Sequence, residues 1–152
     1  MDYLLDRSVT CISVLDISGA ALARAQQRLG PRQGQVRWIE ADVTSEWTVE
    51  RPRVDIWHDR AVFHFLIRAD DRARYRERLL QVLRPGGSVI IATFGPHGPQ
   101  TCAGLATARY SPEQLAAELG GAFRLRDTIR EVHSTPSGTT QDFWYCRFTL
   151  EW

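Results

Sequence analysis

The chain has 152 residues, a length typical of one folded domain, with 43% hydrophobic and 24% charged residues. Its formal net charge of +1 gives no electrostatic reason to expect nucleic acid or an anionic membrane as a partner. No segment approaches the roughly 20 apolar residues of a membrane span, and residues 1–10 lack the basic and apolar regions of a signal peptide. Three widely spaced cysteines suit neither a disulfide framework nor a zinc site, so we expect a protein of the reducing cytoplasm.

Helical and strand patterns alternate in the first third of the chain. They predict, in chain order, the end of a helix at 1–7, a strand at 9–15, a helix at 19–29 and a strand at 35–43. Ser18 can cap the helix at its start, and Gly30 with Pro31 ends it. An acid stands at the end of each strand: Asp16 at the first and Asp42 at the second.

The same alternation continues through the rest of the chain. The patterns predict a strand at 53–59, a helical stretch at 61–83 broken near Asp70, a strand at 88–95, a loop at 96–110, a helix at 111–119 and strands at 123–134 and 140–152. The turn residues TPSG join the last two strands as an antiparallel hairpin. Within the longest helical stretch, alternating arginines predict a solvated face: Arg72, Arg74, Arg76 and Arg78.

Strands separated by helices predict an α/β fold in a single domain, residues 1–152. We expect a doubly wound, mostly parallel sheet with a C-terminal antiparallel hairpin at one side. Ligands of such sheets bind beyond the carboxyl ends of the strands. Asp16, Asp42 and the pair His58–Asp59 are therefore expected along one rim.

Four segments resemble the class I S-adenosylmethionine-dependent methyltransferases, and the resemblance runs through nearly the whole chain. SVLDIS is similar to the second strand of that family, WIEADV to its third, and VDIWHDRAVFHFL to its fourth strand and the following turn. LRPGGSVIIATF resembles the fifth strand and its approach, and is the most specific of these matches. The resemblance implies S-adenosylmethionine as the cofactor and a Rossmann-like methyltransferase fold.

The resemblance also implies roles for the residues at the strand ends. Asp16 would accept hydrogen bonds from the ribose, Ile17 would pack on the adenine, and Asp42 would accept from the adenine amino group. Val43 would offer its backbone N–H, and His58 would border the methionine end of the cofactor. A strand-end Asp also serves as a helix cap or loop residue, and a strand-end His as a satisfied structural group, so these alternatives stay open.

Asp59 and His64 are the candidate catalytic residues. Methyl transfer from a sulfonium is an in-line displacement, so alignment dominates and a base is needed only for a protonated acceptor. Either side chain could remove that proton, although His64 is equally consistent with a packed core residue. The four histidines show no metal-ligand spacing.

The family's first strand and its glycine loop, D-x-G-x-G-x-G, have no counterpart among the fifteen residues that precede Asp16. That loop holds the methionine carboxylate through its backbone N–H groups, so we expect weak cofactor binding. The missing first strand would also be the central one, which leaves two inner strand edges unpaired. We expect direct pairing of these edges or their completion by a second chain, with a homodimer favoured over a monomer.

Two functions follow from these residues. The first is S-adenosylmethionine-dependent methyl transfer to an unidentified small-molecule or protein acceptor, impaired in this truncated form of the domain. The second is a non-methylating relic of the fold that acts as a partner subunit or hosts another activity such as hydrolysis. No G-x-S-x-G motif supports hydrolysis. Titration with S-adenosylmethionine and S-adenosylhomocysteine separates the two functions.

Overall fold

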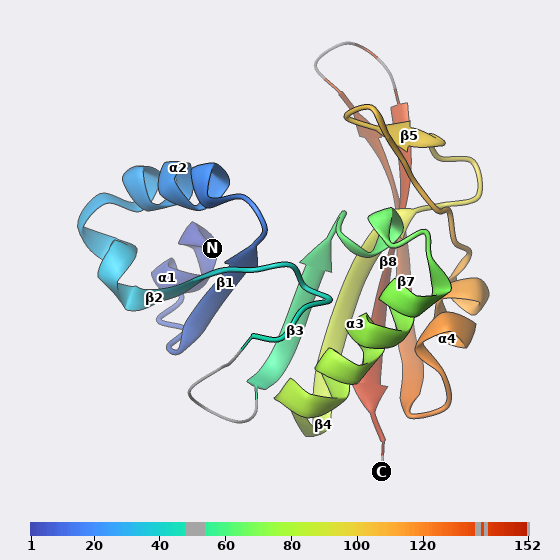
Figure 1. Ribbon diagram of the computed structural model, residues 1–152, viewed down its shortest axis with the longest axis horizontal. Helices are drawn as coiled ribbons and strands as arrows, with labels where there is room; N and C mark the ends of the chain where they lie inside the picture. The colour runs from blue at the N-terminus through green and yellow to red at the C-terminus, as the bar shows by residue number, and fades with distance from the viewer. Residues whose placement is uncertain (48–53, 136–137, 139, 152) are drawn as a thin grey trace. The chain divides into compact units, whose positions relative to one another are not determined.

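The computed structural model describes residues 1–47, 54–135, 138 and 140–151 (Figure 1). The chain divides into two compact units, Met1–Thr48 and Val49–Trp152. Each unit has its own helices and its own hydrogen-bonded strands. None of the helices in the described residues is long and apolar enough to cross a bilayer.

The first unit is a β-α-β arrangement preceded by a short helix. Its elements are α1 (Asp2–Asp6), β1 (Ile12–Asp16), α2 (Gly19–Leu29), the 3₁₀ helix η1 (Gly30–Gln35) and β2 (Val36–Glu40). The two strands pair in parallel along their whole length. Ser18 caps α2 as predicted, because its hydroxyl accepts a hydrogen bond from the Ala21 amide at 3.2 Å. The predicted helix is confirmed, and both predicted strands are present with shorter bounds.

The second unit is a four-stranded mixed sheet with two helices. Its elements are β3 (Val54–Arg60), the 3₁₀ helix η2 (Phe63–Phe65), α3 (Ala69–Val82), β4 (Leu83–Phe94), β5 (Thr101–Cys102), β6 (Leu105–Ala106), α4 (Pro112–Leu119), β7 (Phe123–Ser134) and β8 (Thr140–Leu150). The order in the sheet is β3-β4-β8-β7, with β3 parallel to β4 and β8 antiparallel to both of its neighbours. The α/β fold class and the C-terminal antiparallel pair are therefore confirmed.

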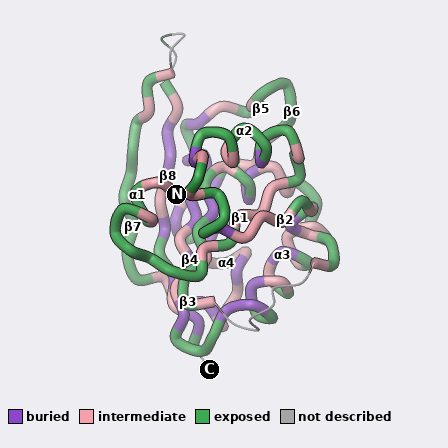
Figure 2. Tube along the Cα trace, turned by 90° about the vertical axis from the view of Figure 1, so that its left-hand side faces the viewer, coloured by how far each residue is buried: buried purple, intermediate pink, exposed green. Residues whose placement is uncertain are grey.

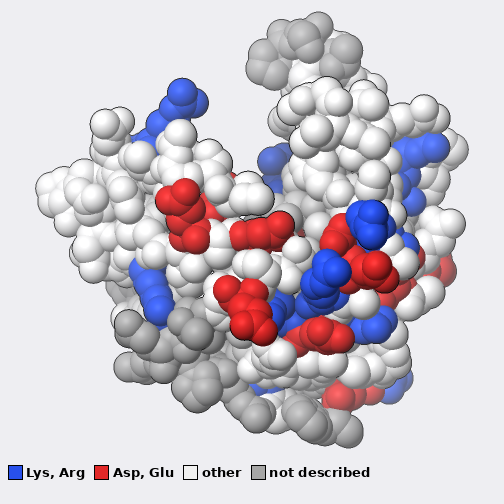
Figure 3. Space-filling view, viewed as in Figure 1, with Lys and Arg blue, Asp and Glu red and all other residues white. Residues whose placement is uncertain are grey.

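Helices α3 and α4 lie side by side against one face of this sheet. The core beneath them consists of buried side chains from the helices and strands: Tyr75, Leu79, Val89, Ile91, Leu115, Leu119, Cys146 and Phe148. Arg72 joins the two helices, since its Nε donates to Glu118 Oε2 at 2.8 Å. The prediction of a fully solvated arginine face on α3 is wrong at this residue, whose side chain is 17% exposed. Basic and acidic side chains otherwise interleave over α3 (Figure 3).

The other face of the sheet carries a smaller aromatic cluster. Ala92, Phe94 and Phe143 are buried there, and Tyr145 packs against them. Phe94 and Phe143 are register partners on β4 and β8, with ring centroids 4.8 Å apart. The edge strand β7 is exposed along most of its length (Figure 2).

Two boundaries differ from the sequence prediction. The LRPGG segment belongs to β4 rather than to a turn before it, because Leu83 pairs with Val54 before the register shifts. The predicted loop 96–110 contains the small hairpin β5–β6, whose turn places Ala103 and Gly104 at φ of 50° and 81°. Gly104 suits this left-handed turn because it has no Cβ, whereas Ala103 adopts a positive φ despite its Cβ.

Each unit has a parallel ladder of its own. In the first unit β1 pairs with β2, and in the second unit β3 pairs with β4. Each pair of strands is joined by a helical crossover, which is the connection that a parallel ladder requires. The predicted completion of the two inner edges, directly or by a second chain, stays a prediction.

Candidate active site

Two carboxylates stand at the carboxyl edge of the β1–β2 pair. Asp16 ends β1, and its Oδ1 accepts a hydrogen bond from the Ser18 amide at 2.8 Å. Asp42 follows β2, and its Oδ1 accepts from the amide and the hydroxyl of Thr44 at 2.8 and 2.7 Å. In the described part of the chain, no group donates to Oδ2 of either acid. Each acid thus closes a local turn, in line with the alternative interpretation as a loop residue, and still keeps one oxygen free for a ligand donor.

The residues that follow these acids differ in exposure. Ile17 is 70% exposed beside Asp16, and an apolar side chain in that position can cover an aromatic ring. Val43 is only 8% exposed, so its contribution to a ligand is limited to its backbone, as predicted. These residues suit the adenosine part of a nucleoside cofactor, whose hydroxyl and amino groups are hydrogen-bond donors.

Glu40 is a third carboxylate at this edge that the sequence interpretation did not assign. It is the register partner of Asp16 in the β1–β2 ladder. Its side chain covers the start of α2, where a Cβ added at Gly19 would lie 2.6 Å from Oε2. The only sequence signal was its position in the IEAD segment, two residues before Asp42.

In the second unit, His58 and Asp59 point to opposite faces of β3. Successive side chains of a strand alternate, so adjacent residues cannot share a face. His58 is exposed, whereas Asp59 is buried under α3 with 5% exposure. The structure therefore does not bring these two candidate residues together.

The Asp59 carboxylate is fully occupied by donors from the protein. Its Oδ1 accepts from the Val62 amide at 3.0 Å, and its Oδ2 from the Phe63 amide at 3.2 Å and the Tyr75 hydroxyl at 2.8 Å. Trp57 Nε1 in turn donates to the Tyr75 oxygen at 2.9 Å. Burial raises the pKa of Asp59 to about 6, with these hydrogen bonds opposing the shift. The carboxylate thus holds the η2 turn in place.

His64 lies on that turn and is completely buried. Its ring stacks on Phe94 at a centroid distance of 4.4 Å and meets the edge of Phe65 at 4.5 Å. Neither ring nitrogen has a hydrogen-bond partner in the described residues. Burial lowers the pKa of His64 to about 4, so its imidazole is neutral at pH 7. The packing agrees with the core interpretation of His64, and a role of Asp59 or His64 as a base stays a prediction.

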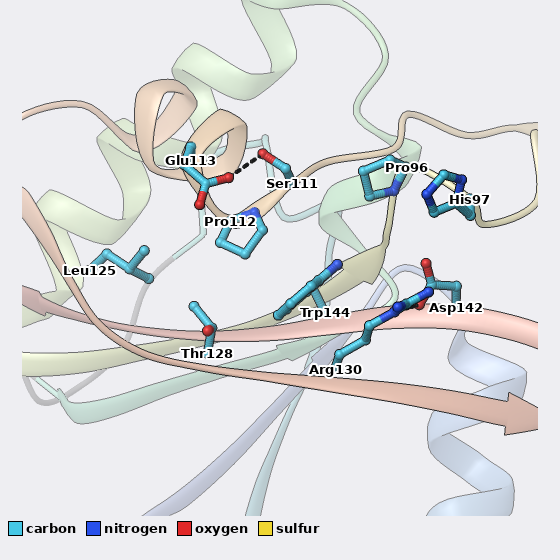
Figure 4. A pocket seen from close by; sticks show the side chains of 10 residues that line it. All are labelled: Pro96, His97, Ser111, Pro112, Glu113, Leu125, Thr128, Arg130, Asp142 and Trp144. Atoms are coloured by element: carbon cyan, nitrogen blue, oxygen red, sulfur yellow. Dashed lines mark hydrogen bonds and ion pairs between the residues drawn. The ribbon is translucent and has the colours of Figure 1, made fainter.

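A hollow of about 460 Å³ lies elsewhere in this unit, and no sequence pattern predicted it. Its lining residues come from the loop after β4, the start of α4 and the β7–β8 hairpin: Pro96, His97, Ser111, Pro112, Glu113, Leu125, Thr128, Arg130, Asp142 and Trp144 (Figure 4). Residues so far apart in the chain have no common motif, which explains why pattern analysis missed them. Within the described ranges no cluster of His, Cys, Asp and Glu side chains could hold a metal ion.

Comparison with known sequences places these features in a family. The sequence model of a family described as "Methyltransferase domain" matches residues 2–87. Over 89 residues the chain is 35% identical to malonyl-[acyl-carrier protein] O-methyltransferase of Paenibacillus sp. (strain JDR-2). This alignment covers 57% of the chain. The chain spans 31% of the length of that enzyme.

Solved structures share the fold. The 1,6-didemethyltoxoflavin-N1-methyltransferase of Burkholderia thailandensis, with its substrate and S-adenosylhomocysteine bound, is similar with a TM-score of 0.75 and 21% identity, over 99% of this chain and 65% of that one. A SAM-dependent methyltransferase of Methanosarcina mazei gives a TM-score of 0.73 and 13% identity, over 91% and 81%. With the family match over more than half of its residues, the chain belongs to the class I S-adenosylmethionine-dependent methyltransferases, whose cofactor is S-adenosylmethionine.

Proposed function

We propose that the chain transfers the methyl group of S-adenosylmethionine to a small-molecule acceptor. One observation carries this proposal: Asp16 and Asp42 end adjacent parallel strands, and each keeps a carboxylate oxygen without a donor. Donor groups of an adenosine would complete both acids. The bound cofactor supplies an electrophilic methyl group on its sulfonium, and the chain supplies binding and orientation.

The residues of the first unit bind the adenosine part. Asp16 Oδ2 accepts from the ribose hydroxyls, and Ile17, 70% exposed, covers one face of the adenine. Asp42 Oδ2 accepts from the adenine amino group, and the Val43 amide donates to the ring. Asp16 and Asp42 are held by their own Oδ1 hydrogen bonds, so little rotamer freedom is lost when the ligand binds.

The residues of the second unit act on the acceptor side. Asp59 fixes the η2 turn through the Val62 and Phe63 amides, and this turn carries the neutral, buried His64. His58 is exposed on β3 and is accessible to a ligand of this unit. We assign Asp59 to positioning, because both of its oxygens are engaged and an acceptor would have to displace a protein donor.

Isothermal titration with S-adenosylhomocysteine tests the proposal. We expect measurable binding, because Asp16 and Asp42 each keep one carboxylate oxygen for a donor of the ligand. Asp16→Asn removes one charged acceptor and is expected to weaken binding by about tenfold or more. Asp6→Asn is the matched control, because Asp6 lies in the same unit and pairs with Arg32 at 2.6 Å.

Two results would contradict the proposal. Complete absence of binding would favour the non-methylating alternative. Binding that Asp16→Asn leaves unchanged would remove the ribose assignment.

A further inference from the structure

The hollow described above runs along the face of β7 and β8, from Leu125 and Thr128 to the loop that follows β4. Its loop end lies at the rim beyond the carboxyl end of β4, because β4 ends at Phe94, which pairs with Phe143 near the start of β8. The loop that follows β4 is fastened to β8, because the Gly95 amide donates to the Asp142 carbonyl at 2.8 Å. Such a rim is the usual place for ligands in doubly wound sheets.

Asp142 is a buried carboxylate with one unsatisfied oxygen in this hollow. The residue is 7% exposed, and its Oδ1 accepts from Arg130 Nε at 2.8 Å. Oδ2 has no hydrogen-bond partner in the part of the chain that the structure describes. A buried acceptor without a donor is costly, and a ligand that donates to Oδ2 would relieve that cost.

Gly95 sets the position of this oxygen. A Cβ added there would lie 2.8 Å from Asp142 Oδ2 and 2.8 Å from Trp144 Cδ1, closer than real contacts allow. A glycine is therefore required to keep the carboxylate and the indole where they are. Gly95 is itself buried within the loop.

The walls around Asp142 favour a flat ligand without negative charge. Figure 4 shows the Trp144 ring between Pro112 on one side and Asp142 with Arg130 on the other. The positive charge of Arg130 is matched by Asp142, and a second carboxylate, Glu113, lines the hollow. Trp144 offers an aromatic surface, and the acids disfavour an anion.

From this geometry we infer that the hollow binds the methyl acceptor, and that the acceptor is a planar ring that donates an N–H to Asp142 Oδ2 and packs on Trp144. The identification of the ligand as the acceptor rests on the proposed function. The hydrogen bond sets the orientation of the ring, and Trp144 supplies the contact area.

Two neutral probes with the same bicyclic ring test the inference by NMR. The amino probe, 2-aminobenzoxazole, carries N–H donors, whereas the dimethyl probe, 2-(dimethylamino)benzoxazole, has none. Binding is followed through the indole N–H signals of ¹⁵N-labelled full chain, with the Trp144 signal assigned by Trp144→Phe. We expect the amino probe to shift the Trp144 signal and to bind about tenfold or more tightly than the dimethyl probe.

Variants assign the effect to the carboxylate. Asp142→Asn replaces the acceptor by an amide whose N–H group faces the ligand, so the preference for the amino probe is expected to disappear. Asp127→Asn is the matched control on the same hairpin. The Asp127 carboxylate is exposed, accepts from Arg147 Nε at 2.6 Å and lies outside this hollow. The preference for the amino probe should therefore persist in this variant. If Asp142→Asn fails to fold, the two probes on the unmodified chain still decide the matter.

Equal affinity for the two probes, or shifts that leave the Trp144 signal unmoved, would overturn the inference. Titration of the same sample with S-adenosylhomocysteine separates the two proposals. If the cofactor binds and the two probes bind equally well, the inference about the hollow is wrong and the proposed function stands. Probe preference without cofactor binding supports the N–H recognition and overturns the identification of the ligand as a methyl acceptor.

Discussion

At the scale of single residues, Asp59 shows how a buried carboxylate can be kept for shape rather than for chemistry. Three donors surround it, two amides of the η2 turn and the Tyr75 hydroxyl. Burial nevertheless dominates its titration and raises its pKa to about 6. The hydrogen bonds offset only part of the cost of burying the charged carboxylate, so the free energy of unfolding depends on pH.

The direction of that dependence follows from the shift. Asp59 holds its proton more tightly in the folded chain than in the unfolded one, so the free energy of unfolding falls as the pH rises from about 4 to about 6. Asn in its place does not titrate. We expect the stability difference between the unmodified chain and Asp59→Asn to shrink by about 3 kcal/mol across this window.

Urea denaturation of both proteins at several pH values measures this difference. Asp55→Asn is a control on the same strand, since Asp55 is exposed and pairs with Arg84. Parallel stability curves for the unmodified chain and Asp59→Asn would show that Asp59 is not the titrating group.

At the same scale, the limits of sequence interpretation have a physical cause. The positions of Asp16 and Asp42 at one edge could be predicted, because Asp16 ends β1, Asp42 follows β2, and the ends of parallel strands share an edge. Strand alternation by itself puts the side chains of His58 and Asp59 on opposite faces of β3, although both were expected along one rim. Asp142 could not be found, because its environment depends on Arg130 and Gly95, which come from other strands and loops.

At the scale of elements, one ion pair connects the two helices of the second unit. Arg72 on α3 donates from Nε to Glu118 on α4 and from Nη1 to the carbonyls of Leu66 and Ile67, at 2.8, 3.0 and 2.9 Å. It therefore satisfies carbonyls of the segment before α3 as well as the acid on α4. The alternating arginine pattern on α3 could not distinguish this residue from its solvated neighbours.

Arg72→Gln tests the contribution of this connection. The variant leaves Glu118 without its partner and removes a donor from two carbonyls, so we expect a loss of about 1–3 kcal/mol in the free energy of unfolding. Arg74→Gln is the control, because Arg74 makes an exposed pair with Asp71 on the same helix and should cost at most about 0.5 kcal/mol. Equal losses in the two variants by chemical denaturation would contradict the distinction.

At the scale of the whole molecule, local connections decided which strands could be predicted to pair. The β7–β8 ladder was predicted from the TPSG hairpin, whereas no turn or pattern indicated that β8 pairs with β4. Helix and strand content thus follows from local pattern, whereas a ladder between strands without a short connection depends on distant chain segments.

The exposed edge strand β7 has a consequence for how the protein behaves when concentrated. Its twelve residues include the exposed apolar side chains Ile129 and Val132, which a strand from another molecule could cover. Arginines and a register shift between Leu125 and Asp127 interrupt this edge, and such charges and bulges hinder strand addition. Concentrated salt screens the charges and so removes their repulsion of another strand, while the apolar side chains stay exposed. Fibril growth during storage would therefore begin at β7.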